Sequence, residues 1–184
     1  TGKSTVASLM ALNGMRVIDA DSISHQILDK HSDWVSETFG AEYVNNGKVD
    51  RASLGAMIFS NPEKKKILEE FLHPKIRDEI QMQSIKQDGF EFPYLIDIPL
   101  FFENGAYDIK DSVVVYTPSD VQLERFMKRN KYSKEESLKR IASQMPIDEK
   151  KAKATWVIDN SKNLKHLQQE VEDFVGIIKE KYLK

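Results

Sequence analysis

The chain has 184 residues, a length that suits one α/β domain with small inserted subdomains. Its formal net charge of −2 gives no sign of a nucleic-acid or membrane surface, and no apolar run approaches the ~20 residues that span a bilayer. Cysteine is absent, which excludes disulfides, a thiolate metal site and a cysteine nucleophile. We therefore expect a cytoplasmic protein, a monomer or weak homo-oligomer, with no nucleic-acid or membrane partner.

The chain begins inside a phosphate-binding pattern, G-x-x-x-x-G-K-[ST]. Its second half is present as Thr1, Gly2, Lys3, Ser4 and Thr5. The first glycine of the pattern falls upstream of residue 1, so we expect the native protein to continue N-terminally with a strand and the rest of the loop. A G-K-[ST] triplet arises by chance in roughly one chain in ten of this length, so a surface turn is the alternative.

The residues that follow favour a phosphate loop over a turn. Residues 4–13 have the apolar spacing of a helix, and Gly14 stands where a helix commonly ends. The backbone N–H groups at the start of such a helix, together with the Lys3 ammonium, attract phosphate oxygens. The Ser4 hydroxyl is then available to Mg²⁺.

Four short apolar segments predict strands, and each is nearly continuous in hydrophobicity, as expected of strands covered on both faces. They are Arg16–Ile18, Tyr94–Ile98, Val113–Tyr116 and Trp156–Ile158. With the strand expected upstream, they predict an α/β fold with a five-stranded parallel sheet and helices on both sides. A packing helix is predicted from Asn163 to about Lys181.

Two stretches are too long for a single crossover helix. Residues 22–90 contain several helical patterns and predict an inserted helical subdomain, in which one helix starts at Pro62 and is interrupted at Pro74. Residues 119–153 are rich in Lys and Arg and predict a helix, a turn near residues 130–133 and a second helix. A solvated charged face explains their lysines, whereas arginines in a lid are a common way to stabilise a transferred phosphoryl group.

Acidic residues stand at the carboxyl ends of the predicted strands, where open parallel sheets bind ligands. Asp19 and Asp21 follow the first strand, and an Asp there accepts a hydroxyl proton or helps to hold Mg²⁺ through water. The alternative is that Asp21 or Ser22 caps the next helix. Asp97 lies inside an apolar strand, where a carboxylate is unfavourable unless it is paired or linked to a metal.

Two further strand ends carry weaker signals. Glu103 follows the strand of Asp97 on a loop, where a solvated charge is an equally good explanation. Asp159 and Asn160 end the last strand, in a loop expected near the adenine of a bound nucleotide, although a plain turn accounts for them as well.

Together these motifs resemble the dephospho-coenzyme A kinase family over essentially the whole chain. The matching segments, in order, are Gly2–Thr5, Val17–Asp21, Phe39–Gly40, Ile58–Pro62, Leu72–Arg77, Pro99–Glu103, Gln122 with Arg125, Arg140 with Gln144, and Val157–Asn160. The departures are Phe101 for the usual Leu, Ser161 where the family often has a nearby Gly, and the missing first part of the phosphate loop.

The resemblance implies a P-loop kinase fold and transfer of the ATP γ-phosphoryl group, with Mg²⁺, to the ribose 3′-hydroxyl of dephospho-coenzyme A. It implies that Lys3 contacts the β- and γ-phosphates, that Ser4 ligates Mg²⁺ and that Asp21 is the general base. The remaining roles fall to Arg140 as a lid arginine, Asp97 at the Walker B position beside the metal, Asn160 and residues 1–5 at the nucleotide, and His73, Arg77 and Glu103 at the acceptor.

Three other functions fit the same motifs. The nearest is a different small-molecule or nucleoside monophosphate kinase on the same scaffold. The second is an ATP-dependent switch or ATPase without an acceptor, and the third is a non-catalytic binding protein. The four histidines have no metal-ligand spacing, so a zinc site is not expected.

Overall fold

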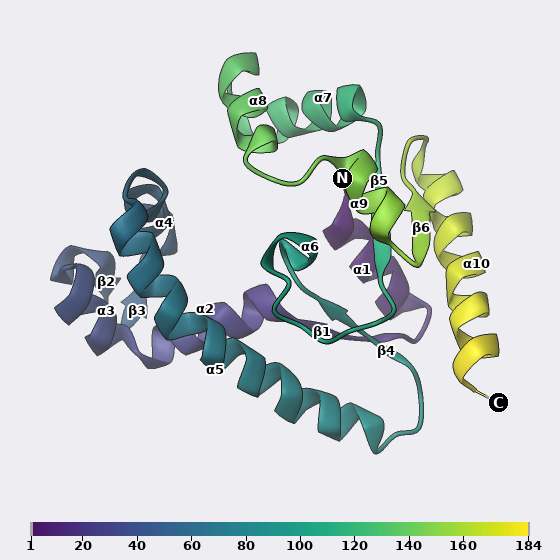
Figure 1. The fold of residues 1–184 in the computed structure, drawn as a ribbon, viewed down its shortest axis with the longest axis horizontal. Helices are drawn as coiled ribbons and strands as arrows, with labels where there is room; N and C mark the ends of the chain where they lie inside the picture. Colours follow the sequence, from purple (N-terminus) through teal and green to yellow (C-terminus); the bar gives the residue numbers. More distant parts are fainter. Residues whose placement is uncertain (1, 184) are drawn as a thin grey trace. The chain divides into compact units, whose positions relative to one another are not determined.

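The computed structural model describes residues 2–183. In chain order, its elements are α1 (Lys3–Leu12), β1 (Arg16–Asp19), α2 (Ala20–Lys30), α3 (Ser32–Phe39), the 3₁₀-helix η1 (Ala41–Tyr43), β2 (Val44–Asn45), β3 (Lys48–Val49), α4 (Arg51–Ser60), α5 (Pro62–Asp88), β4 (Tyr94–Asp97), α6 (Phe101–Asn104), β5 (Val113–Tyr116), α7 (Ser119–Asn130), α8 (Lys134–Ala142), α9 (Ile147–Lys153), β6 (Trp156–Asp159) and α10 (Leu164–Tyr182). Figure 1 shows these elements along the chain. Within the described residues, no helix combines the length and apolar character that crossing a membrane requires.

The four predicted strands are all present, each within one residue of its predicted end. They form two pairs, β1 with β4 and β5 with β6, and β5 and β6 are parallel with Val113 opposite Trp156 and Tyr116 opposite Asp159. The expected count of five strands stays a prediction, because it includes a strand expected before residue 1.

The chain divides into two compact units, and the first contains the described residues of the ranges 1–17, 92–95 and 99–184. Its core joins α1, β5, β6 and α10, and α10 runs beside β6 in Figure 1. Helix α10 is amphipathic, and the side chains that recur every three or four residues on one face are buried. They are Leu167, Val171, Phe174, Val175 and Ile178.

The second unit contains Ile18–Glu91 and Ile96–Ile98. The helices expected within residues 22–90 are present, and α2 packs against α5. Buried Val35, Phe39 and Leu72 belong to its core, and the Trp34 ring stacks on Phe71 with ring centroids 3.6 Å apart.

The prediction that Pro74 interrupts a helix is wrong, since α5 runs without a break from Pro62 to Asp88. A proline inside a helix loses one backbone hydrogen bond and costs about 3 kcal/mol. Here the apolar face continues through the proline, because Leu68, Leu72 and Ile76 are spaced four residues apart and all pack in the core of the second unit. Burial of that face outweighs the lost hydrogen bond.

The antiparallel hairpin of β2 and β3 was not predicted from the sequence. Its turn is Asn46-Gly47, and both residues have positive φ, 50° and 73°. Asn-Gly is the preferred pair for such a two-residue hairpin turn, so the dipeptide was the signal that could have revealed it.

Candidate functional site

The N-terminus of α1 presents the remaining half of the phosphate loop. Gly2 precedes the helix with φ 90° and ψ 21°, a left-handed conformation, and its carbonyl accepts the N–H of Val6 at 3.1 Å. At a helix start, the first N–H groups have no partner within the helix and can bind a ligand or water. Lys3 and Ser4 are exposed, and no acidic residue lies in the first turn to oppose an anion. Thr1 lies outside the described residues.

Gly2 lies directly against the side chain of Asn160, in the same unit. A Cβ atom built on Gly2 would be only 2.3 Å from Asn160 Nδ2, far closer than real Cβ atoms approach other heavy atoms. Asn160 follows β6 and is 7% exposed. The structure therefore brings together two of the residues expected at the nucleotide, the phosphate loop and the loop after the last strand.

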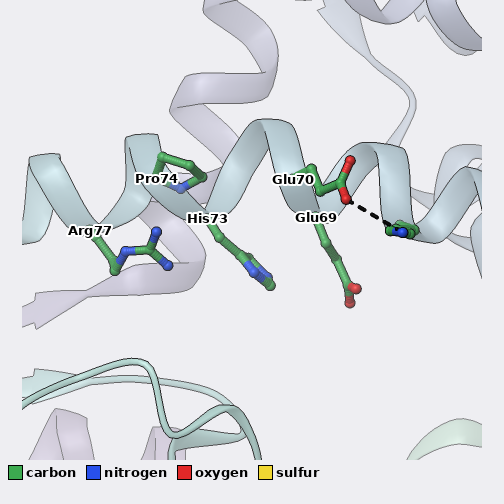
Figure 2. Close-up of a pocket in the computed structure, with 6 residues that line it drawn as sticks. Glu69, Glu70, His73, Pro74 and Arg77 are labelled. Carbon is green, nitrogen blue, oxygen red and sulfur yellow. Dashed lines mark ion pairs between the residues drawn. The ribbon is translucent and has the colours of Figure 1, made fainter.

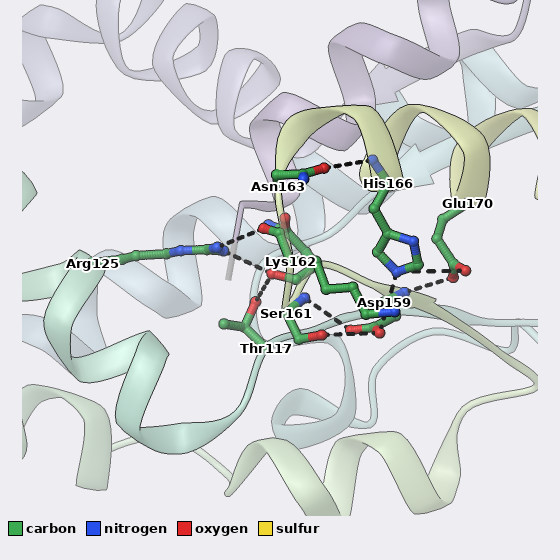
Figure 3. Close-up of polar contacts among 9 residues, drawn as sticks. Thr117, Arg125, Asp159, Ser161, Lys162, Asn163, His166 and Glu170 are labelled. Atoms are coloured by element: carbon green, nitrogen blue, oxygen red, sulfur yellow. Dashed lines mark hydrogen bonds and ion pairs between the residues drawn. The ribbon is translucent and has the colours of Figure 1, made fainter.

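Both backbone groups of Asn160, its N–H and its carbonyl, are hydrogen-bonded. Its N–H donates to the Tyr116 carbonyl at 2.8 Å, and its carbonyl accepts from Arg125 Nη1 at 2.8 Å and from the buried Thr117 Oγ1 at 3.4 Å. Arg125 Nη2 also donates to the Lys162 carbonyl at 3.3 Å, so one guanidinium spans the loop, as Figure 3 shows. The sequence marked Arg125 as part of a family motif in the stretch predicted to form a lid, but it gave no sign of these partners, because any residue type can supply a backbone carbonyl.

Asp159 is a structural turn residue at the start of the same loop. Its carboxylate accepts the Ser161 N–H at 2.8 Å and the Ser161 hydroxyl at 3.0 Å, and His166 Nε2 lies 3.4 Å away (Figure 3). Burial raises the pKa of Asp159, but the hydrogen bonds from Ser161 and His166 outweigh it and hold the pKa below its ordinary value. The plain turn, the simpler of the two explanations, accounts for these contacts.

Glu103 lies on α6 and contacts the segment that follows α8. Its Oε1 atom accepts the Met145 N–H at 2.9 Å and lies 2.7 Å from Lys150 Nζ. Burial raises the pKa of Glu103, but the Lys150 ammonium and the Met145 N–H outweigh it, so the pKa lies below its ordinary value of 4.5. The described contacts of this carboxylate are thus with the protein itself.

This pKa shift predicts a stability change in acid. Because folding lowers the pKa of Glu103, its ionised form stabilises the fold above pH 4.5, and that stabilisation is lost as the pH falls through the lower folded value. We expect wild type and Glu103→Gln to differ in thermal unfolding midpoint by a constant amount at about pH 6 to 7, and by less below about pH 4. A difference that does not change with pH would contradict the assignment.

Arg140 lies on α8, in the stretch predicted to form a lid. Its Nη2 atom is 3.3 Å from Glu136 Oε1, and its guanidinium lies over the Tyr132 ring at 4.6 Å from the ring centroid. Glu136 belongs to α8, and Tyr132 belongs to the turn before it.

In the second unit, Asp19 is the N-cap of α2, and the alternative that Asp21 or Ser22 is the cap is wrong. Asp19 Oδ1 accepts the N–H groups of Asp21 at 2.9 Å and Ser22 at 3.2 Å. Asp21 is therefore the second residue of the helix, exposed, with its carboxylate not required for capping. The capping interaction thus accounts for Asp19 and not for Asp21.

His73 and Arg77 are one turn apart on α5 and line the same shallow surface hollow (Figure 2). Its other lining residues are also on α5: Lys66, Glu69, Glu70 and Pro74. Asp97 is the half-buried last residue of β4. Within the described residues, no group of three or more His, Cys, Asp or Glu side chains is arranged to hold a metal ion.

Comparison with known proteins places these features in a family. Residues 1–166 match the family model for dephospho-CoA kinase. The chain is 69% identical to a dephospho-CoA kinase of Sulfurimonas denitrificans over 183 residues, which is 100% of this chain and 92% of the relative. It is 44% identical to a dephospho-CoA kinase of Wolinella succinogenes, over 99% of this chain and 92% of the relative.

A solved structure agrees with these sequence matches. The dephospho-CoA kinase from Campylobacter jejuni superposes with a TM-score of 0.76 at 37% identity, covering 98% of this chain and 93% of that one. The α/β fold predicted from the sequence, a P-loop kinase fold, is thereby confirmed.

Proposed function

Because this chain belongs to the dephospho-CoA kinase family, and thus phosphorylates dephospho-CoA with ATP in coenzyme A biosynthesis, we propose how its residues divide that reaction. The accepting group in this proposal is the ribose 3′-hydroxyl. Phosphoryl transfer passes through a loose transition state, so the protein mainly positions the reactants and neutralises charge.

The start of α1 holds the triphosphate. Its N–H groups and the Lys3 ammonium supply charge-assisted hydrogen bonds to the β- and γ-phosphates. The observation that supports this role is the close approach of Gly2 to Asn160, because it places the start of α1 beside the loop after β6, the second segment expected at the nucleotide. Asn160, with Thr1 and Thr5 of the loop, contacts the nucleotide in this proposal.

Ser4 and Asp97 are the residues proposed to hold Mg²⁺. Their hydroxyl and carboxylate oxygens are the donor types that Mg²⁺ prefers, and this ion usually takes only one or two protein ligands besides phosphates and water. A site of this kind needs no cluster of three acidic or histidine side chains. When bound, the ion neutralises charge that develops on the phosphate oxygens.

Asp21 orients the acceptor hydroxyl and takes its proton. A carboxylate is a weak base for an alcohol in the ground state, so the proton transfers late, when the hydroxyl oxygen is already bonding to phosphorus. Arg140 neutralises charge on the transferred group, and Arg77 with His73 binds the acidic acceptor.

A panel of acceptors tests this function. ADP formation is measured with Mg²⁺-ATP and, separately, dephospho-CoA, AMP, shikimate or no acceptor. We expect ADP to appear rapidly with dephospho-CoA alone, and the product to carry the new phosphate on the ribose 3′-oxygen by ³¹P NMR. Equal rates with AMP would identify a nucleoside monophosphate kinase, and hydrolysis that ignores every acceptor would identify an ATPase.

We also propose that the reaction takes place in the cytoplasm, where a cysteine-free ATP-dependent enzyme meets its substrates. The same proposal extends to a monomer or weak homo-oligomer, because every role above falls on residues of a single chain. Sedimentation velocity at micromolar concentration checks the second point.

A further inference from the structure

Glu103 links two segments of the first unit that are far apart in the sequence. It lies on the short helix α6, shortly after β4, and its partners Met145 and Lys150 lie beyond the end of α8 and on α9. The side chains of Glu103 and Lys150 are only 20% and 17% exposed. A pair this shielded is screened less by solvent and salt than a surface ion pair.

Three successive residues after α8 are each hydrogen-bonded. Ser143 bonds back to the last turn of the helix, because its hydroxyl donates to the Arg140 carbonyl at 2.8 Å and its N–H donates to the Lys139 carbonyl at 3.1 Å. Gln144 donates its N–H to the Ile141 carbonyl, and Met145 donates its N–H to Glu103. Glu103 is therefore bonded to the backbone five residues after Arg140, at the end of the turn that follows α8.

Both oxygens of the Glu103 carboxylate are turned into the protein. Oε1 accepts from Met145 and Lys150, and Oε2 is shielded from solvent. An acceptor substrate cannot reach either oxygen while these contacts hold. This geometry differs from the expectation that Glu103 contacts dephospho-CoA.

We propose that Glu103 is a positioning residue for Arg140 and not a substrate contact. It fixes the chain where α8 ends, so that the helix presenting Arg140 to the transferred phosphoryl group cannot drift. A misplacement of about 1 Å in a positioning group lowers rates by up to about 10²-fold, so a remote anchor is sufficient to affect the chemistry. This inference rests on the proposed role of Arg140 in phosphoryl transfer.

The test compares Glu103→Ala with Glu103→Gln in steady-state kinetics and in hydrogen exchange over residues 139–146. We expect Glu103→Ala to lower kcat about fivefold, to leave the KM for dephospho-CoA unchanged, and to speed exchange in this segment. Glu103→Gln should fall between wild type and Glu103→Ala, because its amide oxygen still accepts the Met145 N–H but carries no charge for Lys150. It also supplies a folded variant if the alanine variant does not fold.

The matched control is Asp111→Ala. Asp111 pairs with Lys181 at 2.8 Å, nearly the length of the Glu103–Lys150 pair, but it anchors the end of α10 and not α8. We expect unchanged kcat and unchanged exchange over residues 139–146.

Two results would overturn the proposal. A raised KM for dephospho-CoA with kcat retained in both Glu103 variants would make Glu103 a substrate contact. Wild-type exchange rates in Glu103→Ala would show that Glu103 does not fix this segment. Should wild type itself lack acceptor-dependent ADP formation, the proposed function fails, and the exchange result still decides whether Glu103 fixes the segment.

Discussion

Replacing Asp21 with Asn should lower kcat by at least about 10²-fold and leave the Kd of ATP nearly unchanged. The amide keeps the size and some hydrogen bonding of the carboxylate, but it cannot accept the hydroxyl proton as phosphorus bonds to the oxygen. Asp21 is exposed in the first turn of α2, and Asn has nearly the same size. Stopped-flow measurement of ADP formation, with ATP binding followed by calorimetry, gives both quantities.

Asp19→Asn is the matched control for this experiment. It removes a carboxylate two residues away, and its side-chain oxygen can still cap α2 by accepting the N–H groups of Asp21 and Ser22. We expect activity within a few-fold of wild type, since Asn caps helices about as well as Asp. Near-normal kcat in Asp21→Asn would remove Asp21 from the mechanism, and a larger loss in Asp19→Asn would transfer the role to Asp19.

Gly2→Ala should weaken ATP binding at least about tenfold. The added methyl group would approach the Asn160 amide to 2.3 Å, so the loop and the amide cannot keep their present positions. A displacement that costs about 1.4 kcal/mol of binding free energy weakens the Kd tenfold. The Kd of ATP, measured by calorimetry with and without Mg²⁺, tests the expectation.

Gly14→Ala separates strain from the close contact. Gly14 also has positive φ, 83°, but a Cβ atom there meets nothing within 4 Å. Both variants should lose stability through backbone strain, and only Gly2→Ala should lose ATP affinity. If the two variants bound ATP equally well, the approach of Asn160 to Gly2 would have no part in nucleotide binding.

Much of the fold could be predicted because its signals are local. Each predicted strand is a short run of apolar residues, and β1, β4, β5 and β6 are found where those runs lie. The buried face of α10 follows from side chains spaced three and four residues apart. The end of α1 near Gly14 was likewise predictable, because a glycine commonly follows the last turn of a helix.

The errors arise where distant residues decide the outcome. Pro74 was expected to interrupt a helix, yet Leu68, Leu72 and Ile76 pack against a core that the local sequence does not reveal. The alternative that Asp21 or Ser22 caps α2 lay two or three residues too late, because Asp19, Asp21 and Ser22 are all good caps and only the end of β1 decides among them.

The same difference between local signals and distant partners applies to the candidate site. The motif of residues 1–5 predicted a phosphate-binding loop, and the structure adds that Asn160 lies against Gly2. The attachment of Arg125 to two carbonyl groups and of Glu103 to a backbone N–H could not be predicted, since any residue type supplies those partners. The roles of Asp21, His73 and Arg77 stay predictions that mutagenesis can test.

The central claim is that Lys3 and the amides of α1 hold the triphosphate while Asp21 receives the proton of the acceptor. A crystal structure with a non-hydrolysable ATP analogue and dephospho-CoA bound together tests it most directly. We predict Lys3 Nζ within hydrogen-bond distance of a terminal phosphate oxygen, and the Asp21 carboxylate bonded to the ribose 3′-hydroxyl directly or through one water. An Asp21 carboxylate turned away from that hydroxyl, with another base in its place, would contradict the account.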